Sequence, residues 1–108
     1  MSDNKLRILI VDDEEDVRSP LAEWLRRSER MSVDTTASGE EALALIQEAD
    51  GAYDAVLLDE VLPGIDGIQT LERIKADFPN IEVIMFTGRS PESGLEALRK
   101  GAYRYIMK

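Results

Sequence analysis

The sequence contains no cysteine and no histidine among its 108 residues. Without cysteine, the chain has no disulfide, no thiol nucleophile and no zinc–thiolate site. Without histidine, it lacks the usual general base at neutral pH and any phosphohistidine of its own. No apolar run reaches the length of a membrane span, and the polar start of the chain, Met1–Asn4, is unlike a signal peptide. We therefore expect a cytoplasmic protein.

Positive charge is scarce as well. The chain has 22 acidic against 13 basic residues, which gives a formal net charge of -9. Such a surface repels nucleic acid and anionic membranes, so we expect neither as a direct partner. The 108 residues, of which 44% are hydrophobic, are enough for one small domain with one core and leave no room for a second.

Five short apolar segments predict the strands of a sheet. Three of them are dense runs of valine, isoleucine and leucine, which are typical of strands buried on both faces, as in a parallel sheet. A weaker segment follows the first predicted helix, and the last one ends the sequence. The predicted strands are Leu6–Val11, Ser32–Ala37, Ala55–Leu58, Ile81–Phe86 and Tyr103–Met107.

Amphipathic segments between these strands predict four helices. Pro20 should delay the first helix to about Asp16 or Val17, or bend it, because proline lacks an N–H and crowds the preceding turn. Capping-box spacing opens the second and third helices. The apolar face of the first helix comprises Val17, Leu21, Trp24 and Leu25, and the two capping pairs are Ser38 with Glu41 and Asp66 with Gln69.

A cap residue followed by proline, Ser90-Pro91, opens the fourth predicted helix. Leu95 and Leu98 should point inward, and Gly101 should end the helix. The order of elements is then β-α-β-α-β-α-β-α-β. Alternation with short links predicts an α/β domain with a parallel sheet and helices on both faces. No predicted helix follows the fifth strand.

Polar residues stand at the carboxyl ends of four of these strands, where doubly wound sheets bind their ligands. Asp12 and Asp13 follow the first strand, Asp59 the third, Thr87 the fourth and Lys108 the fifth. Crowded carboxylates repel one another, and a hard divalent cation such as Mg²⁺ offsets that repulsion. Mg²⁺ completes its shell with phosphate oxygens, while an ammonium and a hydroxyl suit the other side of a phosphoryl group. The set therefore indicates phosphoryl transfer.

Asp59 is the best candidate for the phosphoryl acceptor. It stands alone on its strand, whereas Asp12 and Asp13 are adjacent and suit metal binding. A carboxylate can take the phosphoryl group as an aspartyl phosphate. Because the chain has no histidine, the donor must be another protein or a small reactive phosphate. Taken singly, each residue has a simpler interpretation: Asp12–Asp16 as acids at a helix N-terminus, and Asp59 as a turn residue before Pro63-Gly64.

Four motifs in order resemble the receiver family of bacterial response regulators. They are ILIVDDEEDVR with the acidic pair, LLDEVLPGIDG with the acceptor aspartate, MFTG with the switch threonine, and GAYRYIMK with the aromatic switch position and the lysine. The resemblance extends from Ile8 to Lys108. It implies a flavodoxin-like, doubly wound, five-stranded parallel sheet of order 2-1-3-4-5. It also implies a two-component phosphorelay switch that uses Mg²⁺ and is not an enzyme beyond catalysing its own phosphorylation and dephosphorylation.

The resemblance also implies a role for each site residue and a set of partners. A sensor histidine kinase or a phosphotransfer protein would phosphorylate the domain, and an output domain or a downstream protein would respond. The implied roles are Asp13 as a direct Mg²⁺ ligand, Asp12 as a ligand mainly through water, Asp59 as ligand and acceptor, Val61 as a carbonyl ligand, Lys108 as the partner of the phosphoryl oxygens, and Thr87 and Tyr105 as switch residues.

One departure concerns the end of the sequence. In the receiver family the lysine is normally followed by proline and a fifth helix, whereas this sequence ends at Lys108. We therefore interpret residues 1–108 as a C-terminally truncated receiver that lacks the fifth helix and any output domain. Glu60 and Val61 flank the acceptor at positions that tune the lifetime of the phosphoryl group in this family.

Two other classes of protein share such a pattern of elements. A Mg²⁺-dependent phosphatase with an aspartyl nucleophile would carry an Asp-x-Asp pattern at the end of the first strand, where this chain has Asp12-Asp13-Glu14. A flavin-binding module would need a hydroxyl- or glycine-rich phosphate loop there, and the acids Asp12–Asp16 would repel a phosphate without a metal. Both alternatives fit less well than the phosphorelay switch.

Overall fold

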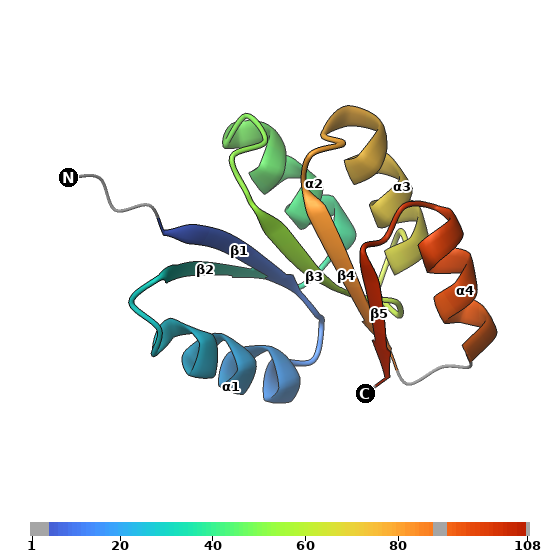
Figure 1. The fold of residues 1–108 in the computed structure, drawn as a ribbon. Helices are drawn as coiled ribbons and strands as arrows, with labels where there is room; N and C mark the ends of the chain where they lie inside the picture. Colours follow the sequence, from blue (N-terminus) through green and yellow to red (C-terminus); the bar gives the residue numbers. More distant parts are fainter. Residues whose placement is uncertain (1–4, 88–90, 108) are drawn as a thin grey trace.

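The structure is a computed structural model that describes residues 5–87 and 91–107. Its five strands form one parallel sheet of order β2-β1-β3-β4-β5, as expected. The elements in chain order are β1 (Leu6–Val11), α1 (Glu15–Arg26), β2 (Met31–Thr36), α2 (Gly39–Glu48), β3 (Ala55–Asp59), α3 (Gly67–Asp77), β4 (Glu82–Thr87), α4 (Pro91–Arg99) and β5 (Arg104–Met107). Figure 1 shows α1 on one face of the sheet and α2, α3 and α4 on the other.

Each face of the sheet has its own apolar core, because neighbouring residues of a strand point to opposite faces. Leu9 and Val11 of β1 pack with Ile46 of α2 on the face of three helices. Ile8 and Ile10 of β1 pack with Ala22 of α1 on the other face. Strand β1 therefore lies buried on both sides, which explains its nearly continuous apolar sequence.

The helix starts follow the predicted caps with small differences. Helix α1 begins at Glu15, one residue earlier than expected, and runs through Pro20. Asp66 and Gln69 form a complete capping box at α3. At α2, Ser38 accepts from the backbone N–H of Glu41, but the Glu41 carboxylate accepts from Ala37 and not from Ser38. Pro91 opens α4, and Ser90 lies outside the described residues.

The prediction that Leu95 and Leu98 point inward is wrong. Their side chains are 54% and 43% exposed, whereas Ala97 is fully buried. Helix α4 turns Gly94 and Ala97 toward the sheet because the ring of Tyr105 on β5 occupies the space above Gly94. Small residues therefore form the packing face of this helix, and the leucines lie on its outer side.

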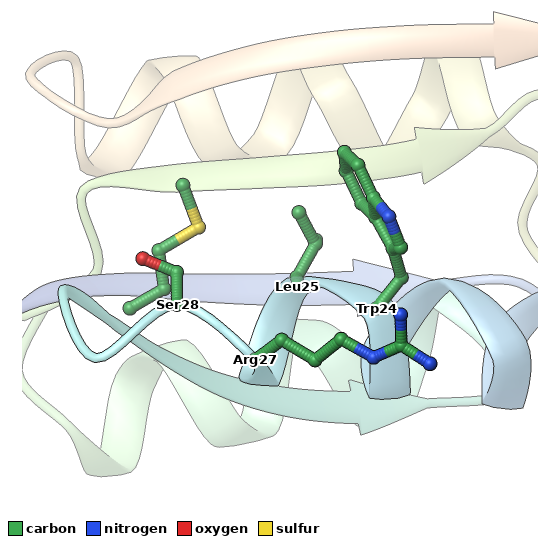
Figure 2. A pocket seen from close by; sticks show the side chains of 5 residues that line it. Trp24, Leu25, Arg27 and Ser28 are labelled. Atoms are coloured by element: carbon green, nitrogen blue, oxygen red, sulfur yellow. The ribbon is translucent and has the colours of Figure 1, made fainter.

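The face of the sheet that carries α1 is only partly covered by the described residues. Trp24 of α1 is 64% exposed and Ile106 of β5 is 50% exposed. A surface hollow of about 320 Å³ lies at the C-terminal end of α1, with a largely apolar lining. Its lining residues are Trp24, Leu25, Arg27, Ser28 and Met31 (Figure 2). Among the described residues, no helix is both long enough and apolar enough to cross a membrane.

Candidate phosphoryl-acceptor site

The parallel pairing of β1 with β3 brings two aspartates to the same edge of the sheet. Val11, the last residue of β1, is in register with Leu58 of β3, and Asp12 and Asp59 are the next residues along the chain. The side chain of Asp12 is fully buried and that of Asp59 is 3% exposed. Two acidic residues in such positions are costly unless charge or hydrogen bonds compensate for their burial.

A third carboxylate joins these two. Asp12, Glu14 and Asp59 each offer a carboxylate oxygen, and these oxygens all lie within 4.8 Å of one another. Asp13, which the sequence pointed to, is exposed and lies outside this group. The sequence therefore predicted two of the three residues that the structure brings together, and it missed Glu14.

A tight turn after β1 explains the position of Glu14. The backbone N–H of Glu14 donates to Asp12 Oδ1 at 2.9 Å, and Glu14 is the N-cap residue of α1 with an extended backbone. The guanidinium of Arg18, one turn into the helix, donates to the carbonyl oxygen of Asp12 at 2.7 Å. The turn therefore holds the chain so that carboxylate oxygens of residues 12 and 14 lie close to one of Asp59. An acid two residues after Asp12 was the available signal for Glu14.

The segment after Asp59 is held at both of its ends. We call Glu60–Asp66 the acceptor loop. The backbone N–H of Gly67 donates to the carbonyl oxygen of Glu60 at 2.8 Å and closes the loop at its base. Val61 has a side chain that is 48% exposed, whereas Leu62 is nearly buried in the core. The role of the Val61 carbonyl as a metal ligand stays a prediction.

Glu60 adds a further acidic group next to the acceptor. Its side chain is 7% exposed, and its Oε1 atom has no hydrogen-bond partner among the described residues. A buried carboxylate oxygen without a partner is unfavourable, and a nearby cation would reduce that cost. Glu60 is thus a buried acid directly after the acceptor in the sequence, outside the group of three clustered carboxylates.

The remaining predicted site residues lie on β4 and β5 or beyond them. Thr87 is the last residue of β4 and follows Phe86, which is in register with Asp59. Lys108 lies outside the described residues, so its role stays a prediction. Tyr105 on β5 is half-buried and packs against the core, and its hydroxyl donates to Met107 Sδ at 2.7 Å.

The donor set of the clustered carboxylates suits a hard divalent cation. All three groups offer oxygen ligands, which Mg²⁺ and Ca²⁺ prefer. Asp12 and Asp59 are buried and Glu14 is exposed, so the site has one open side toward solvent. A ligand that brings its own oxygen atoms can therefore reach a cation there. These features define an acidic, solvent-accessible site at the carboxyl edge of a doubly wound sheet.

Comparison with known proteins agrees with this description. The family model for the response regulator receiver domain matches residues 8–108. The chain is 42% identical over 108 residues to a protein-glutamate methylesterase/protein-glutamine glutaminase of Trichodesmium erythraeum, covering 96% of this chain and 30% of that protein. It is 36% identical over 106 residues to the transcriptional regulatory protein ResD of Bacillus subtilis, covering 97% of this chain and 42% of that protein.

A solved structure shows the same architecture. The receiver domain protein of Clostridium thermocellum superposes with a TM-score of 0.88 at 29% identity, over 95% of this chain and 82% of that one. The chain belongs to the response regulator receiver family. It is therefore a phosphoryl-accepting signalling domain that switches conformation, and no finding favours a phosphatase. It spans less than half the length of the two curated relatives described above.

Proposed function

We propose that Asp59 is the phosphoryl acceptor of this domain and that a sensor histidine kinase or a phosphotransfer protein is the donor. The observation that supports the assignment is the burial of the Asp59 carboxylate beside Asp12 and Glu14, at the carboxyl end of the central strand. A carboxylate oxygen of Asp59 attacks the phosphorus atom of the phosphohistidine. A P–O bond forms and the P–N bond breaks, and its electron pair returns to the imidazole, which takes a proton from solvent.

Asp12, Glu14 and Asp59 are the residues of the described group that would hold Mg²⁺, with Asp13 and the Val61 carbonyl as further ligands that the family resemblance implies. When bound, Mg²⁺ supplies the positive charge that lets a phosphoryl group approach clustered carboxylates. Asp59 is the last residue of β3, and the backbone N–H of Asp12, directly after β1, donates to the carbonyl oxygen of Thr36 at 3.2 Å, so both need little reorganisation when the site fills. Lys108 and Thr87 belong to the proposal through the resemblance, as groups that meet the phosphoryl oxygens.

A labelling experiment tests the acceptor. The protein is incubated with Mg²⁺ and a small acyl phosphate, and the intact mass is measured. We expect a gain of one phosphoryl group in the wild type, loss of that gain in Asp59→Asn, and its retention in Asp77→Asn, an exposed aspartate at the end of α3. The amide of asparagine is a poor nucleophile, so the stable acyl phosphate cannot form. A phosphoryl group that persists in Asp59→Asn would assign the acceptor role to another residue.

A second experiment tests the part that Glu14 plays. We expect Glu14→Gln to raise the Mg²⁺ concentration for half-maximal labelling by about tenfold, because one negative charge leaves the cluster and ligand charge sets cation affinity. Glu15→Gln is the matched control, since Glu15 is the next residue, is exposed, and is not in the cluster. Equal Mg²⁺ requirements in the two variants would remove Glu14 from the site.

A further inference from the structure

A contact outside the carboxylate cluster ties the acceptor loop to another helix. Glu40, the second residue of α2, accepts a hydrogen bond from the backbone N–H of Ile65 with its Oε2 atom at 3.0 Å. The two residues are 25 positions apart in the sequence. Helix α2 lies beside α3 on the same face of the sheet (Figure 1). A side chain of α2 therefore binds the backbone of the C-terminal part of the loop, two residues before Gly67.

Gly64 lets the carboxylate come close. Its φ angle is +72°, a conformation that residues with a side chain rarely adopt. A Cβ atom at this position would overlap Glu40 Oε2 and would lie 2.9 Å from Oε1. The backbone of the loop thus rests directly on the carboxylate group of Glu40. Because the exposed Glu40 side chain could move aside, it is the positive φ angle that favours glycine at position 64.

The contact with Glu40 is one of several that hold the acceptor loop. At its base, the bond from the Gly67 N–H to the Glu60 carbonyl holds it beside Asp59. The side chain of Leu62 is buried in the core, and the side chain of Ile65 lies against Gly39 of α2. The bond from the Ile65 N–H to Glu40 fixes the backbone of the C-terminal part of the loop against α2. Without this bond, the backbone around Gly64 and Ile65 would be less firmly placed while Asp59 stays at the end of its strand.

Charge strengthens the hydrogen bond between Glu40 and the backbone of Ile65. The hydrogen bond from the Ile65 backbone, and a second one from the backbone of Glu40 itself, lower the pKa of Glu40 below its ordinary value, and Arg73 lowers it further. Glu40 is therefore ionised at neutral pH, and an ionised acceptor makes a shorter and stronger hydrogen bond than a neutral one. The side chain is exposed, so solvent screens part of this gain.

We propose that Glu40 is a positioning residue, which holds the acceptor loop in the arrangement that binds the cation and receives the phosphoryl group. The inference rests on the proposed function of Asp59. Glu40 lies outside the carboxylate cluster, so it acts through the loop. Its loss should therefore raise the Mg²⁺ concentration that labelling requires more than it slows the chemical step.

Four variants separate positioning from a general effect of charge on α2. Glu40→Ala removes the contact, Glu40→Gln keeps an oxygen acceptor at the same reach, and Glu40→Asp keeps the charge on a side chain one methylene shorter. Glu41→Ala is the matched control, because Glu41 is also an exposed acid in the first turn of α2 and also accepts one backbone N–H, that of Ala37, away from the loop. The Mg²⁺ dependence of labelling by a small acyl phosphate is measured for each.

We expect Glu40→Ala and Glu40→Asp to raise the Mg²⁺ concentration for half-maximal labelling by about fivefold, which is the order of effect of one lost hydrogen bond to a charged group at an exposed site. At saturating Mg²⁺ their labelling rates should return to within about twofold of the wild type, because the nucleophile itself is unchanged. Glu40→Gln should fall between Glu40→Ala and the wild type in Mg²⁺ requirement, because it keeps an oxygen acceptor and loses the charge. Glu41→Ala should stay close to the wild type in both quantities.

Other patterns overturn the inference. If Glu40→Asp behaves like the wild type and Glu40→Gln is impaired, the charge acts on the helix N-terminus and not on the loop. If Glu40→Ala and Glu41→Ala have equal Mg²⁺ requirements, the contact has no role in the site. A wild-type protein that takes no label, or an Asp59→Asn variant that keeps it, would instead contradict the proposed function, so the two failures are distinguishable.

Discussion

Replacement of Gly67 by alanine should destabilise the protein by about 2–4 kcal/mol and reduce phosphoryl labelling of Asp59 by more than about tenfold. Gly67 is the first residue of α3, and its Cα lies against the backbone of the acceptor strand. A Cβ atom there would overlap the carbonyl oxygen of Asp59 and would lie 2.6 Å from the Cα of Glu60. Backbone atoms cannot rotate out of the way, so the helix or the end of β3 must shift.

The expected loss of stability is informative because helix propensity alone would predict a gain. Within a helix, alanine is favoured over glycine by about 1 kcal/mol, so a site with free space would be stabilised by this substitution. Urea denaturation gives the stability, and intact-mass labelling gives the effect on the acceptor. Gly39→Ala is a useful comparison, since Gly39 opens α2 in the same way but faces the side chains of Thr70 and Ile65. A stable, fully labelled Gly67→Ala protein would contradict the close contact.

The strands and their common edge could be predicted from the sequence because they depend on a strong and local signal. The predicted Leu6–Val11 strand is found with the same bounds, and the third strand extends only one residue further, to Asp59. A parallel sheet then places the carboxyl ends of adjacent strands together, whatever the loops do. Asp12 and Asp59 come together for this reason, and the structure confirms their proximity.

Loop and turn geometry could not be predicted in the same way. Asp13 and Glu14 are both acids after β1, and the choice between them depends on a single turn that Asp12 Oδ1 and Arg18 stabilise. The sequence alone does not define such a turn, so it does not show that Glu14 joins Asp12 and Asp59. The contact between Glu40 and Ile65 was equally out of reach, because it joins an exposed carboxylate to a backbone N–H 25 residues away, and no sequence pattern marks such a bond.

The error at α4 has a different physical origin. Leucines at helical spacing usually mark the buried face, and Leu95 and Leu98 have that spacing. In this helix the distance to β5 leaves room only for Gly94 and Ala97, because the neighbouring strand supplies a large ring from the other side. Whether the helix or the strand supplies the large side chain depends on both elements. The sequence of α4 alone therefore does not show that Tyr105 of β5 fills this space.

The contact between Gly94 and the ring of Tyr105 gives the second large expected effect on stability. We expect Gly94→Ala to destabilise the wild-type protein by about 1–2 kcal/mol and to stabilise a Tyr105→Ala protein by about 1 kcal/mol. A Cβ on Gly94 would overlap the Tyr105 ring and lie 2.5 Å from its Cγ atom, which cannot swing aside without a change of side-chain rotamer. Without the ring the clash is gone, and only the higher helix propensity of alanine remains.

Urea denaturation of the four proteins in this double-mutant cycle measures the coupling, which should be about 2–3 kcal/mol. Tyr105 is the aromatic switch position that the family resemblance implies, so the cycle also measures how firmly the described conformation holds its ring. A coupling of that size means that the added methyl group on α4 meets the ring of Tyr105 in the described conformation. If Gly94→Ala has the same sign in both backgrounds, the ring does not rest on Gly94 in solution, and α4 takes no part in holding it.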